Sequence, residues 1–506
     1  MLKASVTSRE MRALELNCEY LGVSTLQLME NAGRAVAQEV AARFPTRSRV
    51  VVYAGTGRNG GDGMVAARHL ASQDFHVLFQ LIGREADIKE DIVLQNWTTV
   101  NRMISSVELK IVSDSSMIEP CESNVILDAM LGTGARGTLR PPVLQAVKAV
   151  NDSKGFRLAV DVPSGLDSDT GETLGDVVRA NLTVTFHRIK SGFANAKEYL
   201  GEVKVVDIGV PPEAELHAGP GDVEITKKSR PSGSHKGDFG RLLVVGGSET
   251  YAGAPSYVAL AALRTGVDLA FVAAPTKIAY AISSISPDLI TLKLTGDHFN
   301  PSNLPQIRSA LEKSTAVVIG PGLGNHKETL EAVRKLFELV HELKKPTLID
   351  ADAIGVYGAS KTRFDTPLVL TPHPGEFEEL TGQKPRMELM EKIEDVKKAA
   401  RDKRATILLK GTVDVISDGD RVKLNYTGNP GMTVGGTGDV LAGIVGALLS
   451  QGYAPMEASS SGAFVNGAAG DIVRCEKGFH MVASDLINHI QTVFEKPMIH
   501  RDFRND

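Results

Sequence analysis

Residues 429–446 read NPGMTVGGTGDVLAGIVG and join a glycine-rich segment to an apolar run. Glycines at 431, 435, 436 and 438 permit tight turns and a close approach of the backbone to a ligand. The apolar residues that follow recur at the spacing of one buried helical face, which predicts a helix: Val440, Leu441, Ile444, Val445, Leu448 and Leu449. Free amides at the positive end of such a helix bind anions, above all phosphates.

Asp439 adds a carboxylate to the first turn of this predicted helix. A carboxylate repels phosphate, so it suits a base that takes a proton from a hydroxyl attacking that phosphate better than it suits anion binding alone. The alternative is an aspartate stabilised by the helix dipole, beside glycines that only form a turn. A GTGD segment by itself favours this alternative, because short glycine motifs are weak signals.

Length and composition set the class of protein. A chain of 506 residues is too long for one hydrophobic core, so two or three domains are expected. A hydrophobic content of 42% and a charged content of 23% are ordinary for a globular protein. The net charge of -5 predicts no basic surface and therefore no nucleic-acid partner.

The three cysteines, Cys18, Cys121 and Cys475, lie far apart and form no CxxC pair. This spacing fits a reducing compartment and excludes a cysteine-bound metal site. The opening MLKASVTSREMRALEL lacks the apolar run of a signal peptide, and no segment approaches the length that spans a bilayer. We therefore expect a cytoplasmic protein without a membrane partner.

The first half begins with two predicted helices and then switches to a strand, a glycine-rich segment and a helix. The strand is SRVVVYAG, the glycine segment is GTGRNGGDG at 55–63, and the helix is GMVAARHLASQ. This order is the phosphate-binding half of a nucleotide fold. Gly55, Gly57 and Gly60 fit GxGxxG, and Glu85 follows the next strand as a candidate ribose-binding acid, so an NAD-dependent dehydrogenase is an alternative.

Polar residues then follow several predicted strands of this half. They are Asn59 and Asp62 in the glycine segment, Asp128 in NVILDAMLGTG, and Asp161, Ser164 and Asp167 in RLAVDVPSGLDSDTG. The carboxyl ends of parallel strands converge on one crevice, so we expect these groups to meet. Hard oxygen ligands of this kind suit an alkali or alkaline-earth cation rather than zinc. The alternative is that each residue only caps a turn.

AGTGRNGGDG, LDAMLGTG and DVPSGLD resemble, in order and spacing, the motifs of the NAD(P)H-hydrate epimerase family, over roughly the first 210 residues. The resemblance implies a K+ ion held by Asn59, Asp128 and Ser164. It implies that the dinucleotide hydrate contacts Arg58, Asn59, Gly60, Gly61, Asp62, Gly132, Thr133, Gly134, Ala135, Arg136, Gly137, Thr138 and Asp161.

Asp161 is the candidate for proton handling in epimerisation, because a carboxylate near the altered carbon could assist opening and reclosing of the hydrated ring. Arg58 departs from the family, which usually has Asn there, and so adds a charge beside the substrate. A pairing of Arg58 with a phosphate is the alternative role for it.

A segment rich in proline, glycine and serine separates the two halves, and we place the join between about 212 and 232. From Arg241 buried strands and helices alternate, which predicts a largely parallel sheet with helices on both faces. Residues with candidate chemistry fall at the strand ends: Gly253 in the first loop, Gly322, His373, Glu376, Lys410 and Asp439. A loop histidine for His373 and a solvated strand terminus for Lys410 are the alternatives; in the functional case, Lys410 reaches a phosphate.

NPGMTVGGTGDVLAG resembles the signature of the ribokinase-like superfamily, and its NPGM opening is most similar to the NAD(P)H-hydrate dehydratases. The resemblance implies that the hydrate contacts Ala254, Gly322, His373 and Asp439. It implies that the adenine nucleotide lies along Lys410, Gly411, Thr412, Val413 and Asp414, and along Asn429, Pro430, Gly431, Met432, Thr433, Val434, Gly435, Gly436, Thr437 and Gly438.

For the dehydratase reaction the resemblance implies that the amides around Gly436 and Gly438 form the anion hole for the transferred phosphoryl group and that Asp439 deprotonates the substrate hydroxyl. The phosphorylated hydroxyl is then eliminated to restore the reduced nicotinamide. The fused arrangement fits the prokaryotic members, which use ADP as phosphate donor, and Mg2+ is the expected counterion of the nucleotide.

The expected fold is α/β with two domains, an N-terminal Rossmann-like three-layer domain at 1–212 and a C-terminal ribokinase-like three-layer domain at 225–506. Together they resemble the bifunctional NAD(P)H-hydrate repair family, with NADHX and NADPHX as substrates and a homo-oligomer as the expected assembly. Two alternatives stay open. One is a ribokinase-like vitamin or sugar kinase with an N-terminal dinucleotide-binding module, and the other is a first half that only binds a dinucleotide or a partner protein.

Overall fold

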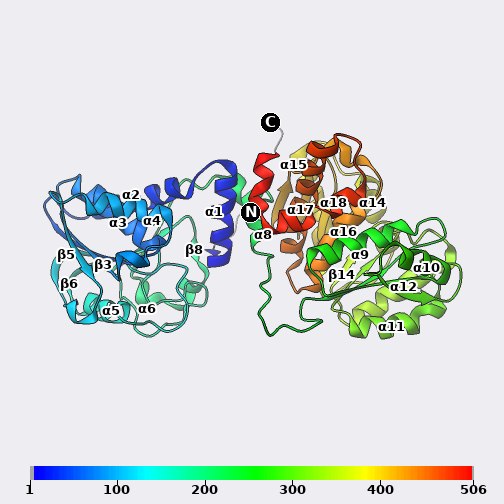
Figure 1. Cartoon of the computed structure of the whole chain (residues 1–506), viewed down its shortest axis with the longest axis horizontal. Coiled ribbons are helices and arrows are strands. Elements are labelled where there is room, and N and C mark those ends of the chain that lie inside the picture. Colours follow the sequence, from blue (N-terminus) through cyan, green and yellow to red (C-terminus); the bar gives the residue numbers. More distant parts are fainter. Residues whose placement is uncertain (1–4, 504–506) are drawn as a thin grey trace. The chain divides into compact units, whose positions relative to one another are not determined.

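The computed structural model describes residues 5–503, which divide into two compact units at 5–211 and 212–503 (Figure 1). Residues 1–4, where the predicted signal-free N-terminus begins, lie outside the described residues. Both units are α/β with mainly parallel sheets, so the predicted fold class is confirmed. In the described part of the chain, no helix combines the length and apolar character needed to cross a bilayer.

The first unit contains a seven-stranded sheet in the order β4-β3-β2-β5-β6-β7-β9, and every neighbouring pair in it is parallel. These strands are β2 (Arg49–Ala54), β3 (His76–Ile82), β4 (Val107–Val112), β5 (Glu122–Ala129), β6 (Lys154–Val160), β7 (Leu182–Phe186) and β9 (Glu202–Val206). A separate parallel pair joins β1 (Ser5–Val6) to β8 (Ile189–Lys190). The strand order reverses between β2 and β5, and ligands of such sheets bind at this point.

The helices of the first unit lie on both faces of its sheet, with α2, α3 and α4 on one side and α5 and α6 on the other (Figure 1). The helices are α1 (Ser8–Leu21), α2 (Thr25–Ala41), α3 (Arg58–Ala71), α4 (Asp91–Asn101), α5 (Val143–Asp152) and α6 (Lys197–Leu200), and the 3-10 turns are η1 (Glu85–Asp87), η2 (Ser115–Met117) and η3 (Ser191–Asn195). The first two helices start at capping boxes formed by Thr7 with Glu10 and by Ser24 with Gln27.

The glycine segment at 55–63 differs from the predicted loop, because α3 already begins at Arg58. Its glycines allow close packing rather than a long flexible turn. A β carbon on Gly60 would lie 1.9 Å from the Gly55 carbonyl oxygen, and one on Gly55 would lie 2.1 Å from the Met130 carbonyl oxygen. Only glycine permits the start of α3 to sit this close to the ends of β2 and β5.

The second unit contains a nine-stranded sheet in the order β12-β11-β10-β13-β14-β15-β16-β17-β18. The strands are β10 (Arg241–Val245), β11 (Leu269–Pro275), β12 (Ile290–Leu294), β13 (Ala316–Ile319), β14 (Thr347–Ile349), β15 (Leu368–Leu370), β16 (Thr406–Leu409), β17 (Asp414–Ser417) and β18 (Val422–Asn425). The sheet is parallel from β12 to β16, and β17 and β18 continue it antiparallel. The predicted mostly parallel sheet is thus confirmed.

Helices cover both faces of this sheet, with α11 and α12 on the opposite face from α9 and α16 (Figure 1). The helices are α7 (Pro212–Leu216), α8 (Pro220–Glu224), α9 (Gly253–Thr265), α10 (Thr276–Ile285), α11 (Leu304–Lys313), α12 (Lys327–Glu342), α13 (Asp352–Gly358), α14 (Pro374–Thr381), α15 (Leu389–Lys403), α16 (Thr437–Ser450), α17 (Pro455–Lys477), α18 (Ala483–Ile487) and α19 (Ile490–Glu495), with η4 (Pro301–Asn303), η5 (Pro430–Thr433) and η6 (Pro497–Asp502). Gly253, predicted to lie in a loop, is the first residue of α9.

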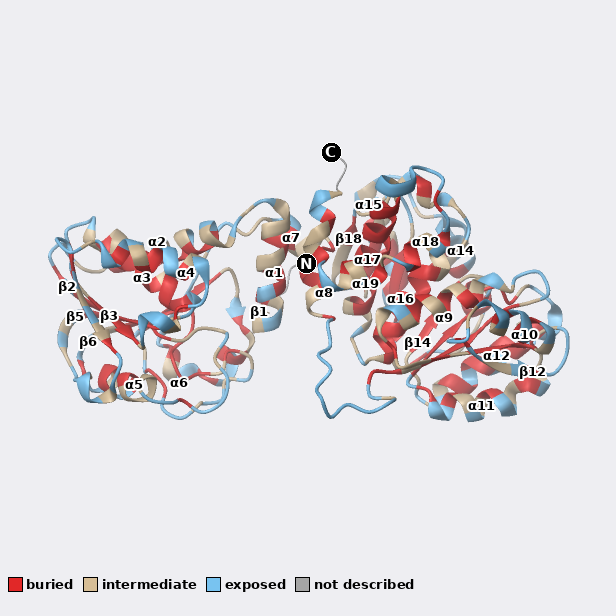
Figure 2. Ribbon diagram, in the orientation of Figure 1, coloured by how far each residue is buried: buried red, intermediate tan, exposed pale blue. Residues whose placement is uncertain are grey.

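Helix α16 is buried on all sides, whereas the sequence predicts one buried face. Every residue from Val440 to Ser450 is buried, and Figure 2 shows the helix in red inside the second unit. Glycines make this possible. A β carbon on Gly443 would lie 2.4 Å from the Val258 carbonyl oxygen of α9, and one on Gly446 would lie 2.5 Å from Val318 of β13. Helix α16 therefore fills the space between the sheet and its neighbouring helices.

Candidate functional sites

Asp128, at the carboxyl end of β5, lies at the centre of the first candidate site. It is fully buried, and its two oxygens accept hydrogen bonds from the Ser164 hydroxyl at 2.5 Å and the Ser164 amide at 2.7 Å. Burial raises the pKa of Asp128 to about 6. The structure therefore brings two of the three predicted metal ligands into direct contact.

Asn59, the third predicted metal ligand, is buried in the first turn of α3 and donates to the Leu131 carbonyl at 2.9 Å. Ser164 binds the same segment, because its hydroxyl accepts from the Leu131 amide at 2.9 Å. The Asn59 side-chain carbonyl oxygen is buried and has no hydrogen-bond partner among residues 5–503. An unpaired buried acceptor is costly unless it binds something, so this donor set fits a hard monovalent cation such as K+.

Asp161 follows β6 and lies against a buried lysine. Its backbone is in the left-handed region at φ 64, a strained conformation for aspartate. One carboxylate oxygen contacts Lys190 Nζ at 2.8 Å and accepts from the Thr185 hydroxyl at 3.1 Å and the Phe186 amide at 3.2 Å. Lys190 is 1% exposed and also donates to the Phe186 and Arg188 carbonyls. The lysine compensates the negative charge of Asp161 inside the protein.

Two further carboxylates face this pair. Burial, followed by repulsion from Asp161 and Glu15, raises the pKa of Asp62 well above its ordinary range. Burial also raises the pKa of Glu15, against the opposing charge of Arg58. The site therefore holds one carboxylate compensated by a lysine and others that retain protons more readily, an arrangement that suits acid and base roles at one centre.

Arg58 is engaged within the protein. It contacts Glu15 at 2.5 Å and Glu90 at 2.6 Å, which joins the start of α3 to α1 and to the residue before α4. These two ion pairs offset the extra charge that distinguishes this position. The pairing of Arg58 with a phosphate stays a prediction.

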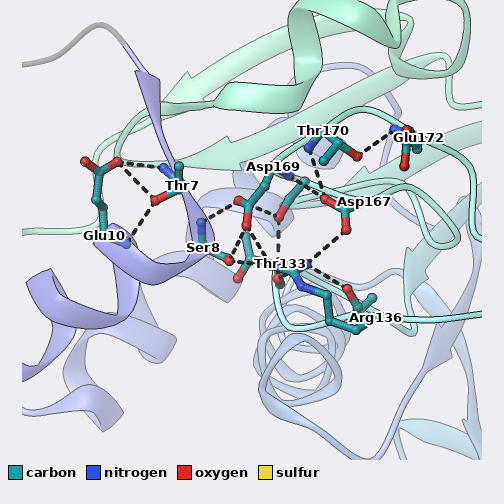
Figure 3. A network of polar contacts seen from close by, with 11 residues as sticks. Thr7, Ser8, Glu10, Thr133, Arg136, Asp167, Asp169, Thr170 and Glu172 are labelled. Atoms are coloured by element: carbon teal, nitrogen blue, oxygen red, sulfur yellow. Dashed lines mark hydrogen bonds and ion pairs between the residues drawn. The ribbon is translucent and has the colours of Figure 1, made fainter. Parts of the chain in front are cut away.

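The loop at 132–138, predicted to contact the substrate, is held through Arg136 (Figure 3). Arg136 donates to the Asp169 carboxylate and to the Ser8 hydroxyl, both at 2.6 Å, and to Asp167 at 3.3 Å. Ser8 in turn donates its amide and hydroxyl to Asp169, both at 2.6 Å. The network connects the start of α1 to two loops beside Asp128 and Ser164, so Asp167 has a structural partner here.

The second candidate site lies at the carboxyl end of the nine-stranded sheet, around Lys410. Its Nζ lies 3.2 Å from Asp350 and 3.6 Å from Glu376, and Asp350 also accepts from the Thr371 hydroxyl at 2.7 Å. Although burial favours the neutral amine, Asp350 and Glu376 raise the pKa of Lys410. Lys410 is therefore a fixed positive charge rather than the solvated strand terminus of the alternative interpretation.

Asp439 lies in the first turn of α16, as predicted. Burial, followed by repulsion from Asp350, raises its pKa to about 7, and Lys410 opposes that rise. A β carbon on Gly438 would lie only 3.4 Å from Lys410 Nζ, which places the lysine against the N-terminus of the helix. A carboxylate that titrates near neutrality, beside free amides and a fixed cation, can accept a proton where a phosphate binds.

Two predicted substrate contacts, Gly322 and Ala254, meet beside this centre. Gly322 adopts φ 66, and a β carbon on it would lie 2.7 Å from the Tyr251 Cβ and 3.3 Å from the Ala254 Cβ. Gly436 precedes α16 at φ 96, and a β carbon there would lie 2.8 Å from the Tyr257 ring. Both glycines satisfy positive φ angles and close contacts that other residues would strain.

The two predicted nucleotide segments are each held by hydrogen bonds to a carboxylate. Asp414 accepts from the Gly411 amide and the Asn425 side chain, both at 2.9 Å, and burial raises its pKa to about 6. Asp471 of α17 accepts from the Asn429 side chain at 2.9 Å and contacts His500 at 2.8 Å. Asp414 and Asp471 thus fix the shape of the two loops.

His373 caps helix α14. Its Nδ1 accepts from the Gly375 amide at 3.0 Å and the Glu376 amide at 3.2 Å, while 56% of its side chain is exposed. The histidine therefore has a structural role as a helix cap, as in the loop-histidine alternative. Its exposed ring also lies beside Glu376, which belongs to the site around Lys410.

Sequence reasoning missed Lys190, Glu15, Asp350 and Asp352 as members of the sites. Asp350 and Asp352 follow β14 and carried the strand-end signal used elsewhere, and Ala351 between them adopts φ 49. Asp352 accepts from the Gly324 amide at 2.8 Å. Lys190 and Glu15 gave no such signal, because only the folded chain brings them to Asp161.

Two protein families match separate parts of the chain. The family described as YjeF-related protein N-terminus matches residues 25–192, and the family described as NAD(P)H-hydrate dehydratase matches residues 242–492. Among solved structures, a ribokinase-like superfamily protein from Enterococcus faecalis V583 has a similar fold with a TM-score of 0.50 and 23% identity, over 56% of this chain and 95% of that chain.

Full-length relatives span both units. The bifunctional NAD(P)H-hydrate repair enzyme of Pyrobaculum aerophilum is 48% identical over 502 residues, which cover 97% of this chain and 98% of that protein. Proteins of the same description from Hyperthermus butylicus and Methanothermobacter thermautotrophicus are 44% and 42% identical, and they cover 98% and 96% of this chain and 93% and 94% of their own lengths.

Proposed function

Because the chain belongs to the family of bifunctional NAD(P)H-hydrate repair enzymes, we propose that residues 1–212 interconvert the R and S hydrates of NADH and NADPH and that residues 225–506 dehydrate the S form. The substrates are then these hydrates, NADHX and NADPHX. The observation that carries this proposal is the identity of 48% to such an enzyme across both units. The buried, near-neutral carboxylate at the start of α16 supports the chemistry assigned to the second unit.

In the dehydratase step, the Asp439 carboxylate takes the proton of the hydrate hydroxyl, and the resulting oxygen attacks the β-phosphorus of ADP. AMP leaves, and the backbone amides around Gly436 and Gly438 stabilise the transferred phosphoryl group. The phosphorylated oxygen then departs as phosphate while the neighbouring carbon loses a proton. This elimination restores the ring double bond, so hydrate and ADP give NAD(P)H, AMP and phosphate.

Lys410 and the two nucleotide segments support this assignment of the donor site. The lysine is a permanent charge facing the N-terminus of α16, where the phosphates of a nucleotide would lie. Asp350 and Glu376 place carboxylate oxygens beside Lys410, and hard oxygens are the ligands that a Mg2+ ion carried by those phosphates prefers. Such an ion would spread the charge of the departing phosphate groups.

In the epimerase step, Asp161 handles the proton that moves when the hydrated ring opens and recloses. Its contact with Lys190 at 2.8 Å supports a charge-compensated carboxylate at this point, and the raised pKa of Asp62 supports a neighbouring proton donor. The orphaned carbonyl oxygen of Asn59 supports a K+ site completed by Asp128 and Ser164, which would hold the loops of the substrate site in place.

Two further features concern the location and the assembly of the protein. Three free cysteines, one of them exposed, support a place in the reducing cytoplasm. Strand β9 ends the order of the seven-stranded sheet and exposes Val203 and Val205, which supports assembly into a homo-oligomer.

The test is to incubate purified protein with a mixture of R and S NADH hydrate, Mg2+, K+ and either ADP or ATP, and to follow recovery of the absorbance of reduced nicotinamide. We expect complete recovery with ADP for the wild type, only the S fraction for Asp161→Asn, and none for Asp439→Asn. A stable phosphorylated product without recovery of NADH would overturn the proposal in favour of a kinase.

A further inference from the structure

The second unit carries a cluster of possible metal ligands that neither proposed reaction uses. His298 precedes η4, while His326 and Glu328 lie at the start of α12. One ligand atom from each of the three side chains can be chosen so that all lie within 4.8 Å of one another. His298 Nε2 lies 2.9 Å from Glu328 Oε2, and the two imidazole rings lie with centroids 3.8 Å apart, tilted by 35°.

The backbone beneath this cluster holds the ligands at fixed positions. Thr329 follows Glu328 and donates its hydroxyl to the carbonyl of Phe299, which follows His298, at 2.9 Å. Thr329 is fully buried and Phe299 is 1% exposed. The two segments that carry the ligands are therefore joined by a buried hydrogen bond one residue beyond the ligands, and a metal ion would not have to bring distant segments together.

The chemical types of the three ligands indicate which kind of ion would bind. Two imidazoles and one carboxylate suit a borderline divalent transition metal, and Ca2+ or Mg2+ prefers all-oxygen sites. Three protein ligands around tetrahedral zinc leave a fourth position for water. Zinc ligands lie about 2.0–2.2 Å from the ion, so the observed spacing needs only a small contraction of side chains that are partly exposed.

We propose that His298, His326 and Glu328 form a surface site for Zn2+ or a similar transition-metal ion, separate from the magnesium and potassium sites of the two reactions. The ion takes the place of two existing interactions, the contact of His298 Nε2 with Glu328 Oε2 at 2.9 Å and the weak bond that His326 Nδ1 accepts from the Glu328 amide at 3.3 Å. The negative charge of Glu328 offsets the unfavourable position of a cation at a helix N-terminus.

The site has a consequence for the segment 320–326. This segment joins β13 to His326, contains Gly322 of the candidate substrate site, and is held at its middle by the bond from the Gly324 amide to Asp352. An ion at His326 fixes the far end of the same segment. We therefore expect zinc to slow amide hydrogen exchange in peptides covering 295–303 and 320–329.

The direct test uses the full-length protein, treated with a chelator and titrated with zinc chloride by calorimetry while Mg2+ is kept in excess. We expect one zinc ion per chain for the wild type. His326→Asn removes the imidazole but keeps an N-cap acceptor, and Glu328→Gln removes the charge at nearly constant shape. Both variants, and His298→Asn, should weaken zinc binding at least tenfold.

His235→Asn is the matched control, since it removes an exposed imidazole from a loop of the same unit. The melting temperature of each chelated variant is measured first, so that loss of folding is not mistaken for loss of the site. Anomalous scattering at the zinc edge in crystals of the zinc-bound wild type then locates the ion. Zinc binding that is unchanged in His326→Asn, absent in the wild type, or located at other residues would overturn the proposal.

Discussion

Asp439 retains its proton to a higher pH than an exposed aspartate does, and the cause is local. Burial and the nearby Asp350 disfavour the charged form, and the Lys410 ammonium opposes them. A general base acts only when ionised, so the pKa of about 7 places the loss of dehydratase activity on the acid side of neutrality.

We predict that kcat/KM for dehydration of the S hydrate falls by about tenfold per pH unit below pH 7, in the free-enzyme profile. Asp439→Asn should lower the rate by about 100- to 10,000-fold. Lys410→Met removes the opposing positive charge, so the acid limb of the remaining activity should move to higher pH. An acid limb that stays in place in Lys410→Met would contradict the assignment of this titration to Asp439.

The ion pair between Asp161 and Lys190 is a second feature at this scale. Lys190→Met leaves a carboxylate buried without its partner, and we predict a loss of about 3–5 kcal/mol in the free energy of unfolding of the first unit. Trp97 is the only tryptophan of the chain and lies buried in α4, so its fluorescence follows denaturant unfolding of this unit alone.

The double variant Asp161→Asn with Lys190→Met should lose less than the sum of the two single variants, because neither charge is left unpaired. Lys148→Met is the control, since Lys148 pairs with Asp176 on the surface and its removal should cost about 0–1 kcal/mol. Equal losses in the free energy of unfolding for Lys148→Met and Lys190→Met would show that the buried pair stabilises the unit no more than the surface pair does.

The predicted cation site gives a stability test. An ion that binds only the folded state at about 100 times its dissociation constant stabilises that state by about 2.7 kcal/mol. We therefore predict that KCl raises the unfolding midpoint reported by Trp97 above its value in NaCl at equal ionic strength.

Asn59→Ala and Asp128→Asn should abolish this difference, whereas Ser168→Ala, which alters a buried hydroxyl outside the predicted ligands, should keep it. A potassium effect of the same size in all four proteins would place the ion elsewhere.

Individual residues show which side chains of the sites could be predicted from the sequence. Asp439, Lys410, Asp128 and Ser164 follow predicted strands or begin a predicted helix, and the structure places each of them in a polar centre. Lys190 was missed because its role becomes visible only when β8 and the end of β6 bring its side chain to Asp161. Arg58 was left open because the partners that neutralise it, Glu15 and Glu90, are distant in sequence.

At the scale of elements, helix α16 combines a polar start with a body that is buried throughout. We predict that Gly443→Ala destabilises the second unit by about 1–3 kcal/mol, because the added carbon would meet the Val258 carbonyl oxygen at 2.4 Å. Gly435→Ala is the control, since nothing lies within 4 Å of the carbon that it adds. Scanning calorimetry should resolve the difference, and equal melting temperatures would contradict the packing argument.

The order and type of these elements could be predicted because buried parallel strands read as apolar runs and the helices between them keep their periodicity. The start of α3 could not be predicted in this way. Its glycines favoured a loop, yet they serve close packing against the Gly55 and Met130 carbonyls. The full burial of α16 was equally hidden, since periodicity identifies one face and the other is covered by α9 and α17 only in the folded unit.

At the scale of the whole molecule, each unit has its own sheet and its own helices on both faces. We predict that residues 212–506, produced alone, dehydrate S NADH hydrate at a rate close to that of the full chain and leave the R form unused. Adding residues 1–211 as a separate protein should restore recovery of both epimers, as followed by absorbance. A fragment 212–506 that is folded by circular dichroism but inactive would show that the second site needs the first unit.

The packing of α16 also restricts the substitutions that this protein can tolerate. A helix in which added carbons at Gly443 and Gly446 would meet a carbonyl oxygen at 2.4 Å and a valine at 2.5 Å has almost no room for mutational drift. Substitutions that enlarge its residues are removed by selection whatever their effect on the chemistry, because they first reduce the amount of folded protein. We therefore expect changes in substrate preference to be tolerated in the loops at the strand ends rather than at Gly443 and Gly446 of the helix that presents Asp439.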